Sequence, residues 1–272
     1  ITIMDPLHII IAIQNNVLYR IALFFFAAYP IVMSLVWITT SFFFRSRWET
    51  DREERKLDAD PSDAFAPFVS ILIPVYNEAD VIGNSIHAAC TIDYPNYEVV
   101  IVNDGSSDGT SEVINGFVGA GMVRVVNKAT NEGKALAIND ALPCLNGEIV
   151  LIIDADAELE PSALRYMVTH FRSGRVAAVA GNPRVKNVET FLARLQLIEF
   201  TSIVSLLRRA QRVWGRVITV SGVVAAFRKS ALIDVGMFSP DMPTEDIDVT
   251  WKLQKRFWDV RYEPNAVVWM NV

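Results

Sequence analysis

The hydrophobic pattern divides the chain into an apolar amino-terminal stretch and a longer part in which short apolar runs alternate with amphipathic ones. Residues 21–44 contain no charged side chain. A helix of that length is about 36 Å long, enough to cross the roughly 30 Å hydrocarbon core of a membrane with some tilt. We therefore expect a transmembrane helix over residues 21–44, preceded by an extracytoplasmic or interfacial segment over residues 1–20.

Basic residues are denser after this stretch than before it. Only Arg20 precedes it closely, whereas Arg45, Arg47, Arg52, Arg55 and Lys56 follow. The positive-inside rule then predicts that the part after the span is cytoplasmic. Residues 45–67 are charged and contain Pro and Ala, which is typical of a cytoplasmic linker.

From residue 68 onward, apolar runs typical of buried strands alternate with helical patterns. Strands are expected over 69–75, 98–103, 123–126, 149–153 and 176–180, with short ones around 219–227 and 267–270. Helices are expected over 80–89, 110–117, 134–142, 161–171, 190–214 and 247–257. This alternation predicts an α/β domain with a mainly parallel sheet over residues 68–272.

The run over 149–153 ends in two carboxylates, Asp154 and Asp156, with one residue between them. Side chains two apart on a strand point the same way, so the pair leaves the carboxyl end of the strand together, where open α/β sheets bind ligands. Adjacent carboxylates repel each other unless a cation lies beside them, and Mg²⁺ or Mn²⁺ fits because both prefer oxygen ligands. The alternative interpretation is a solvated strand end, since aspartate is common in turns.

Polar residues also follow the other expected strands. They are Tyr-Asn-Glu at 76–78, Asn-Asp-Gly-Ser-Ser-Asp at 103–108 and Asn-Glu-Gly-Lys at 131–134. At one edge of a parallel sheet these groups are suited to hydrogen-bond a nucleobase and ribose, while Lys134 and a metal face a diphosphate. Each has a simpler alternative, because Asn77 and Asp104 can cap turns or helices and Lys134 can be a solvated lysine.

Composition narrows the class of partner. The formal net charge is −6, from 25 Lys and Arg against 31 Asp and Glu, which argues against a nucleic-acid partner. The two cysteines, Cys90 and Cys144, form neither a disulfide framework nor a zinc spacing. We therefore expect the globular part to face a reducing compartment.

Thr-Glu-Asp at 244–246 follows a loop and opens the helix expected over 247–257. A sugar hydroxyl is a poor nucleophile until a group such as a carboxylate accepts its proton. A metal ion would meanwhile stabilise the charge that grows on a departing diphosphate. The alternative is an acidic helix start, which is favourable to the helix dipole.

An ordered series of motifs resembles that of the processive family-2 glycosyltransferases. The motifs are PVYNE (74–78), NDGSSD (103–108), NEGKA (131–135), DAD (154–156), GNPR (181–184), TVSGVVAAFRKSAL (219–232) and TEDID (244–248). The stretch over 219–253 is most similar to bacterial poly-β-1,6-N-acetyl-D-glucosamine synthases, which make a biofilm polysaccharide. The resemblance covers nearly the whole chain, and the series is specific for the family but less so for the polymer.

The resemblance implies a Rossmann-like glycosyltransferase A (GT-A) fold and an inverting enzyme that polymerises N-acetylglucosamine from UDP-N-acetylglucosamine. It implies Asp246 as the catalytic base with Glu245 beside it, and Asp156 and Asp154 as metal-binding residues. The implied donor-binding residues are Pro74, Tyr76, Glu78, Asp104, Lys134, Asp154 and Ala155, and the implied acceptor-binding residues are Ser221, Gly222 and Arg184.

The same resemblance implies the partners and the location. The partners would be the UDP-sugar donor, the growing polysaccharide acceptor, the lipid bilayer and a small membrane accessory subunit. The protein would lie in the bacterial inner (cytoplasmic) membrane with its catalytic domain in the cytoplasm, and the polymer would leave through a membrane channel.

The chain departs from the family pattern at one motif. Processive members carry Gln-x-x-Arg-Trp after the Thr-Glu-Asp helix, but Phe257 stands where that arginine is needed, and this stretch falls too early. We therefore expect the GT-A domain over 68–272 to be incomplete at its carboxyl end. On that basis residues 1–272 alone are expected to bind donor without polymerising.

Three alternatives stay open. The same machinery makes chitin, hyaluronan or cellulose in related enzymes. A second class transfers a single sugar to a lipid phosphate. A third is a non-catalytic membrane scaffold, against which the retained Asp104, Asp156 and Asp246 argue.

The amphipathic helix over 190–214 carries a separate hypothesis. Its apolar residues can make one face, with Arg208, Arg209 and Arg212 near anionic lipid headgroups. The alternative is a helix packed on the sheet.

Overall fold

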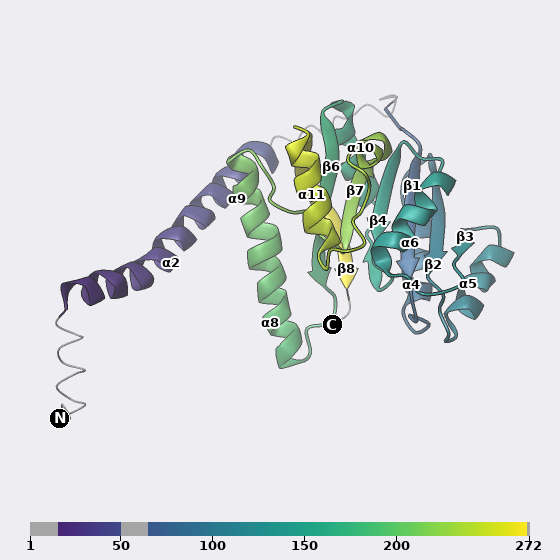
Figure 1. Ribbon diagram of the computed structural model, residues 1–272, viewed down its shortest axis with the longest axis horizontal. Coiled ribbons are helices and arrows are strands. Elements are labelled where there is room, and N and C mark those ends of the chain that lie inside the picture. The colour runs from purple at the N-terminus through teal and green to yellow at the C-terminus, as the bar shows by residue number, and fades with distance from the viewer. Residues whose placement is uncertain (1–15, 50–64, 271–272) are drawn as a thin grey trace.

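The computed structural model describes residues 16–49 and 65–270. Its first element is a long helix, α2 (Val17–Phe44), which continues into a π-helical turn, η1 (Arg45–Glu49). Asn16 caps α2, because its side chain accepts hydrogen bonds from the backbone N–H groups of Leu18 and Tyr19. Figure 1 shows α2 projecting away from the rest of the chain.

The helix over 17–49 is long and apolar enough to cross a membrane. Most of its large apolar side chains are exposed, which is unlike the core helix of a soluble domain. The helix begins at Val17, before the expected span over 21–44. Most of the segments expected over 1–20 and 45–67 falls on residues 1–15 and 50–64, which lie outside the described residues.

The strands of the described residues form one eight-stranded sheet with the order β3-β2-β1-β4-β7-β6-β8-β5. The strands are β1 (Val69–Val75), β2 (Tyr97–Asn103), β3 (Arg124–Asn127), β4 (Ile149–Ile153), β5 (Ala157–Leu159), β6 (Val176–Val185), β7 (Val224–Arg228) and β8 (Asp259–Met270). The first four pair in parallel, β7 is antiparallel to β4 and β6, β8 is parallel to β6, and β5 is antiparallel to β8. The α/β prediction is confirmed, with the parallel half first and a mixed half after it.

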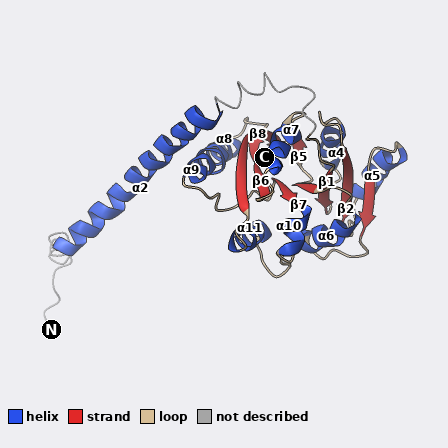
Figure 2. Ribbon diagram, turned by 90° about the horizontal axis from the view of Figure 1, so that it is seen from above, coloured by secondary structure: helices blue, strands red, loops and turns tan. Residues whose placement is uncertain are grey.

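Helices cover both faces of this sheet (Figure 2). One face carries α4 (Ile82–Cys90), α5 (Thr110–Gly119) and α7 (Ala163–Val168), and the other carries α6 (Lys134–Ala141), α10 (Lys229–Asp234) and α11 (Glu245–Lys255). Within β4, Leu151 and Ile153 belong to the first core, whereas Val150 and Ile152 belong to the second. A strand buried on both faces needs apolar residues throughout, which is why β1 and β4 were predicted with the correct bounds.

Several elements differ from the sequence expectation. The strand expected near 267–270 is the end of β8, which already begins at Asp259. Charged residues in its first half hide the strand pattern in the sequence. In the structure these charges are paired, because Arg261 bonds Asp259 at 2.8 Å and Glu263 bonds His170 at 2.9 Å. The short elements β5, α10 and the 3₁₀ turns η2 (Leu142–Cys144) and η3 (Thr169–Arg172) are too brief to show a periodicity.

The long helix expected over 190–214 is present as α8 (Phe191–Glu199), a π-helical segment η4 (Phe200–Leu206) and α9 (Leu207–Val213). The carboxyl-terminal part of α2 packs against α9, and Phe44 is buried there. The ion pair between Arg209 and Glu49, at 2.6 Å, joins the end of the apolar helix to α9.

The lipid-facing role expected for the arginines of this helix is wrong. Arg208 is only 6% exposed, Arg209 pairs with Glu49, and Arg212 pairs with Asp259 at 3.1 Å. Because residues 208 and 212 are one turn apart, both lie on the helix side that packs on the protein. The apolar side chains of Phe191, Leu192, Leu195 and Ile198 are nevertheless exposed on α8.

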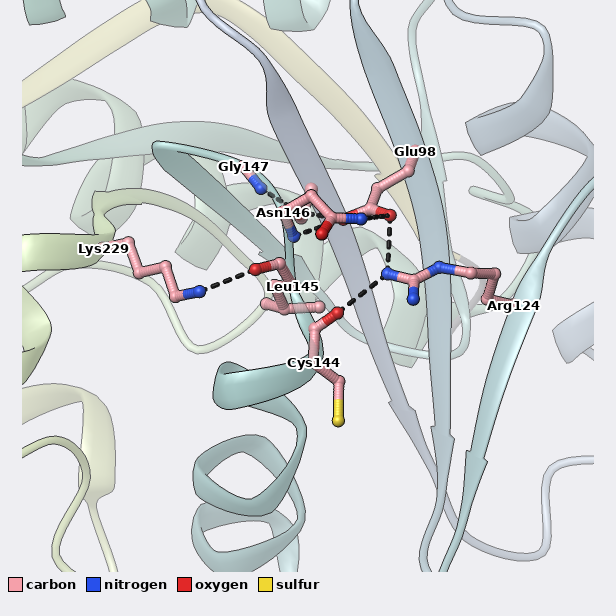
Figure 3. Close-up of polar contacts among 8 residues, drawn as sticks. Glu98, Arg124, Cys144, Leu145, Asn146, Gly147 and Lys229 are labelled. Atoms are coloured by element: carbon pink, nitrogen blue, oxygen red, sulfur yellow. Dashed lines mark hydrogen bonds and ion pairs between the residues drawn. The ribbon is translucent and has the colours of Figure 1, made fainter.

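The amino ends of the parallel strands are joined by polar contacts around Glu98 (Figure 3). Its carboxylate accepts hydrogen bonds from Ser70 Oγ at 2.6 Å and from the Asn146 backbone N–H at 2.7 Å, and it pairs with Arg124 at 2.6 Å. Burial alone would raise the pKa of Glu98, but these hydrogen bonds and the charge of Arg124 outweigh it and hold the pKa below its ordinary value. A side chain at Gly147 would come within 2.4 Å of the Ser70 nitrogen, so this junction requires glycine.

Candidate active site

The opposite edge of the sheet, where β1, β2 and β4 end, holds a cavity of about 470 Å³. It is lined by Pro74, Val75, Tyr76, Glu78, Asp104, Asn131, Gly133, Lys134, Ala137, Asp154, Ala155 and Asp156. All seven residues expected to bind the donor therefore lie together, with Asp156 beside them. Parallel strands bring them together because their carboxyl ends meet at one edge.

The loops after β1 and β2 are tied to each other. The Asn77 side chain accepts a hydrogen bond from the Ser107 backbone N–H at 2.9 Å, and the Asn77 backbone N–H donates to Ser106 Oγ at 3.1 Å. The Glu78 backbone N–H donates to Thr110 Oγ1 at 2.9 Å, at the start of α5. Asn77 thus holds a turn, in a left-handed conformation with φ 55°, while the neighbouring Tyr76 and Glu78 line the cavity.

Asp104 joins the loop after β2 to the loop before α6. Its buried carboxylate accepts hydrogen bonds from the backbone N–H groups of Glu132, at 3.1 Å, and Gly133, at 2.8 Å. Lys128 Nζ lies 3.6 Å from the same carboxylate. Gly105, with φ +71°, allows this close approach, because a Cβ there would lie 2.7 Å from the Thr130 backbone.

Lys134 connects three parts of the site. Its Nζ is 2.5 Å from Asp154 Oδ1, 3.0 Å from the Gly222 carbonyl oxygen and 3.7 Å from Glu245 Oε1. One lysine therefore links the end of β4, the segment before β7 and the start of α11. Lys134 begins α6, which fixes the direction from which its side chain enters the site.

Negative charge is in excess at this edge. Burial raises the pKa of Asp154 even though Lys134 opposes it, and Asp156 and Glu245 add to the rise. Burial and the charge of Asp156 also raise the pKa of Glu78. These groups are crowded beyond what Lys134 neutralises, an arrangement typical of a site that binds a cation or a cationic group.

Asp246 belongs to the same place. It lies in the first turn of α11, and a Cβ added to Gly222 would be 3.6 Å from Asp246 Oδ2 and 3.9 Å from Lys134 Nζ. The Asp246 carboxylate and the Lys134 ammonium group therefore both adjoin Gly222. Asp154 bonds Lys134 and Asp246 adjoins Gly222, so residues more than 90 positions apart in the chain approach the same lysine.

The three residues expected to bind the acceptor are not all together. Ser221 is buried next to Gly222. Arg184 is exposed near the end of β6 and lines a different cavity of about 370 Å³, together with residues of α8 and η4. The Gly222 carbonyl bonds Lys134, which lines the cavity at the ends of β1, β2 and β4, and Ser221 precedes Gly222 in the chain, whereas Arg184 lines a different cavity.

Two buried polar residues near Asp246 were not predicted as part of the site: Arg208, for which the sequence suggested a lipid-facing role, and Thr250. Arg208 is buried at the base of α9, where its guanidinium donates to the Gly181 carbonyl at 3.4 Å, and burial lowers its pKa to about 10. Thr250 is fully buried on α11. Neither stands in a recognisable motif, and only their three-dimensional neighbours reveal them.

The family model for glycosyl transferase family 2 matches residues 70–236, a stretch that carries all the strand-end motifs above. The chain belongs to glycosyltransferase family 2. Its sheet, with a ligand edge formed by β1, β2 and β4, has the GT-A type of fold expected from the sequence.

Among curated relatives, the chain is 37% identical over 249 residues to poly-beta-1,6-N-acetyl-D-glucosamine synthase of Staphylococcus epidermidis. It is 36% identical over 250 residues to the synthase of the same name from Staphylococcus aureus. Both alignments cover 91% of this chain but 60% of the relative, so the chain spans well under two thirds of their length.

Among solved structures, the family-2 chain is similar to mannosyltransferase PcManGT from Pyrobaculum calidifontis in complex with GDP-Man and Mn²⁺. The TM-score is 0.65 at 26% identity, covering 89% of this chain and 67% of that one. Staphylococcus aureus TarS 1–349 in complex with UDP-GlcNAc has a TM-score of 0.58 at 18% identity, covering 75% of this chain and 58% of that one. The second likeness shows a shared fold.

Proposed function

We propose that this protein is a membrane-bound inverting glycosyltransferase that polymerises N-acetylglucosamine from UDP-N-acetylglucosamine into poly-β-1,6-N-acetylglucosamine. The observation that carries the proposal is the position of the Asp246 carboxylate. Across Gly222 it adjoins Lys134, which is bonded to Asp154 in the cavity at the ends of β1, β2 and β4. A base for the acceptor and a binding edge for the donor thus adjoin each other.

The chemistry that this arrangement supports is a single displacement. The Asp246 carboxylate accepts the proton of the acceptor hydroxyl, and that oxygen forms a bond to C1 of the donor sugar. The bond between C1 and the diphosphate oxygen breaks, UDP leaves with the electron pair, and the configuration at C1 inverts. Lys134, which lies next to the carboxylates of Asp154 and Glu245, supplies positive charge where the diphosphate leaves.

The carboxylates at this edge of the sheet are suitable ligands for a hard divalent cation. Asp154 and Asp156 supply carboxylate oxygens. Burial, and after it the charges of neighbouring aspartates including Asp156 and Asp154, raise the pKa of Glu78 beside them, and a cation would relieve that repulsion. The described residues hold no cluster of three metal-ligating side chains. Mg²⁺ and Mn²⁺ are commonly bound by one or two carboxylates together with substrate phosphates. When bound, such an ion would stabilise the negative charge of the departing diphosphate, with Asp156 as its main ligand and Asp154 beside it.

The membrane location is part of the proposal. The apolar helix over 17–49 carries Arg45 and Arg47 in its last turns. Basic residues at that end favour a cytoplasmic position for the catalytic part. The exposed apolar side chains of α8 suit contact with the lipid surface, and the curated relatives' name supports a growing polysaccharide as acceptor. A small membrane accessory subunit stays a prediction of the sequence resemblance.

Sugar-nucleotide competition tests the proposal. The full-length protein in detergent or vesicles is incubated with radiolabelled UDP-N-acetylglucosamine, and label in polymer and released UDP are measured. Excess unlabelled UDP-N-acetylglucosamine is expected to abolish incorporation, whereas UDP-glucose and GDP-mannose are expected to leave it nearly unchanged. The product should be degraded by a hydrolase specific for β-1,6-linked N-acetylglucosamine. Preference for UDP-glucose or GDP-mannose, or transfer of a single sugar to lipid, would reject the assignment.

A further inference from the structure

The segment between α9 and β7 contains Ser221 and Gly222 and has no regular secondary structure over residues 216–223. Parts of it are nevertheless buried, including Val217 and Val220. Buried backbone N–H and C=O groups outside helices and strands need other hydrogen-bond partners. The backbone of this segment is held instead by side chains from the two helices that flank it.

Two glutamines hold the first part of the segment. Gln211, on α9, accepts a hydrogen bond at its Oε1 from the Ile218 backbone N–H at 3.1 Å. Gln254, on α11, donates from its Nε2 to the Val217 carbonyl at 2.6 Å. Each glutamine contacts the segment four or five residues before Gly222, and neither is bonded to Asp246.

Thr250 holds the part nearest to Gly222, and it differs from the glutamines by bonding two partners at once. Its Oγ1 accepts a hydrogen bond from the Val220 backbone N–H at 3.1 Å and donates one to the Asp246 carbonyl at 2.6 Å. Thr250 is fully buried, so water does not compete for either bond. One hydroxyl therefore joins the residue two before Gly222 to the residue whose carboxylate faces Gly222.

We propose that Thr250 is a positioning residue for catalysis, which sets the distance between the Asp246 carboxylate and the acceptor segment at residues 220–222. The proposal rests on the proposed function, because it assumes that Asp246 is the base and that residues 221–222 adjoin the acceptor. A hydroxyl suits this position because it donates and accepts strong hydrogen bonds at the same atom. Valine has the same shape and lacks both bonds, whereas serine keeps both.

The mechanistic consequence is a change in rate rather than in donor binding. The cavity expected to bind the donor is lined by residues at the ends of β1, β2 and β4, in the loop before α6 and in α6, and Thr250 is not among them. Loss of the hydroxyl is expected to shift Asp246 relative to the acceptor, and misplacement of a reacting group by about 1 Å can cost roughly 100-fold in rate.

Four variants test this in the full-length protein: Thr250→Val, Thr250→Ala, Thr250→Ser and, as the matched control, Thr169→Val. Thr169 makes a similar local bond, to the Tyr166 carbonyl at 2.9 Å, but outside the site. We expect the valine and alanine variants to lose about 10- to 100-fold in kcat with KM for the UDP-sugar within about twofold. The serine variant and the control should keep kcat within about threefold. Alanine provides the test if the valine variant does not fold.

A second measurement separates this inference from the proposed function. Amide hydrogen exchange at Val220 does not depend on which sugar is used, or on turnover at all. Exchange is expected to be faster in Thr250→Ala than in Thr250→Ser, with Thr169→Val unchanged. Unchanged kcat in the alanine variant, a loss appearing in KM alone, or equal Val220 exchange in the alanine and serine variants would each overturn the role of Thr250. A parent protein that turns over another sugar nucleotide would reject only the choice of substrate.

Discussion

Carboxylates at the two edges of the parallel half-sheet have opposite pKa shifts. At the amino edge, Glu98 accepts hydrogen bonds from Ser70 and Asn146 and pairs with Arg124, and its pKa is held below the ordinary value (Figure 3). At the carboxyl edge, Asp154 shares Lys134 with Glu245, and its pKa is raised. At one edge of these strands the carboxylate has hydrogen-bond and ion-pair partners. At the other edge several carboxylates lie close together with Lys134 between two of them.

This difference separates stability from function within one sheet. The contacts of Glu98 join residues from β1, β2, β3 and the loop before β4, so they favour the folded state over the unfolded chain. The carboxylates around the cavity do not satisfy each other, and a raised carboxylate pKa in a cleft is typical of a ligand or catalytic site. A cation bound there, as proposed above, would relieve this repulsion.

The largest expected effect is on the rate, at the carboxyl edge. Asp246→Asn removes the carboxylate that we propose accepts the acceptor's proton, while keeping the size of the side chain. Turnover of the UDP-sugar should fall by about 10²- to 10⁴-fold, since general-base catalysis contributes that much. The melting temperature should stay within about 2 °C of the parent. A variant with full activity would show that Asp246 is not the base and would remove the basis for assigning function to this edge.

The next effect is on stability, at the amino edge. Glu98→Gln weakens charge-assisted hydrogen bonds and leaves Arg124 without its ion pair, so the free energy of unfolding should fall by about 2 kcal/mol. Arg124→Gln is the matched control. The Arg124 side chain is 51% exposed, so its replacement should cost less than about 1 kcal/mol. Denaturant unfolding measures both. A larger loss in Arg124→Gln than in Glu98→Gln would contradict the central place of Glu98.

The contribution of Glu98 should also depend on pH. The native pKa lies below the ordinary value of 4.5, so the folded state favours the carboxylate, and the added stability is present above about pH 4.5. It is lost as the pH falls through the native pKa. The difference in unfolding free energy between the parent and Glu98→Gln should therefore be constant near neutral pH and shrink below about pH 4.5. A difference that grows on acidification would mean that the pKa is raised instead.

The smallest expected effect is on stability at the carboxyl edge, and it is a small gain rather than the loss expected for Glu98→Gln. Asp156→Asn removes a charge that repels Asp154 and Glu78, so without divalent ions the variant should be as stable as the parent or about 0.5 kcal/mol more stable. Mg²⁺ or Mn²⁺ added with UDP should raise the melting temperature of the parent but not of this variant, and chelator should reverse the rise. Destabilisation of the ion-free variant would show that Asp156 is a structural residue like Glu98.

Much of the fold follows from the local pattern of the sequence. β1 and β4 lie between two cores, so their uninterrupted apolar runs have no other stable place, and their bounds were predicted correctly. β8 was predicted only in part because Arg261 and Glu263 look unsuited to a buried strand until Asp259 and His170 pair with them. For Arg208, Arg209 and Arg212 the sequence left two hypotheses open, a lipid surface and a helix packed on the sheet, because a sequence does not show which partner a charge will find.

The sequence by itself determined the strand-end motifs, the carboxylate pair at 154 and 156, the acidic start of α11 and an apolar helix long enough to span a membrane. These are local properties: a run of residues sets its own period, and residues two apart on a strand share a face. Only the tertiary structure decided that Asp246 faces Gly222 beside Lys134, that Arg184 lines another cavity, and that Thr250 joins α11 to Val220. Those contacts connect residues that lie far apart along the chain, and their geometry is fixed by how the helices pack on the sheet rather than by any neighbouring residue.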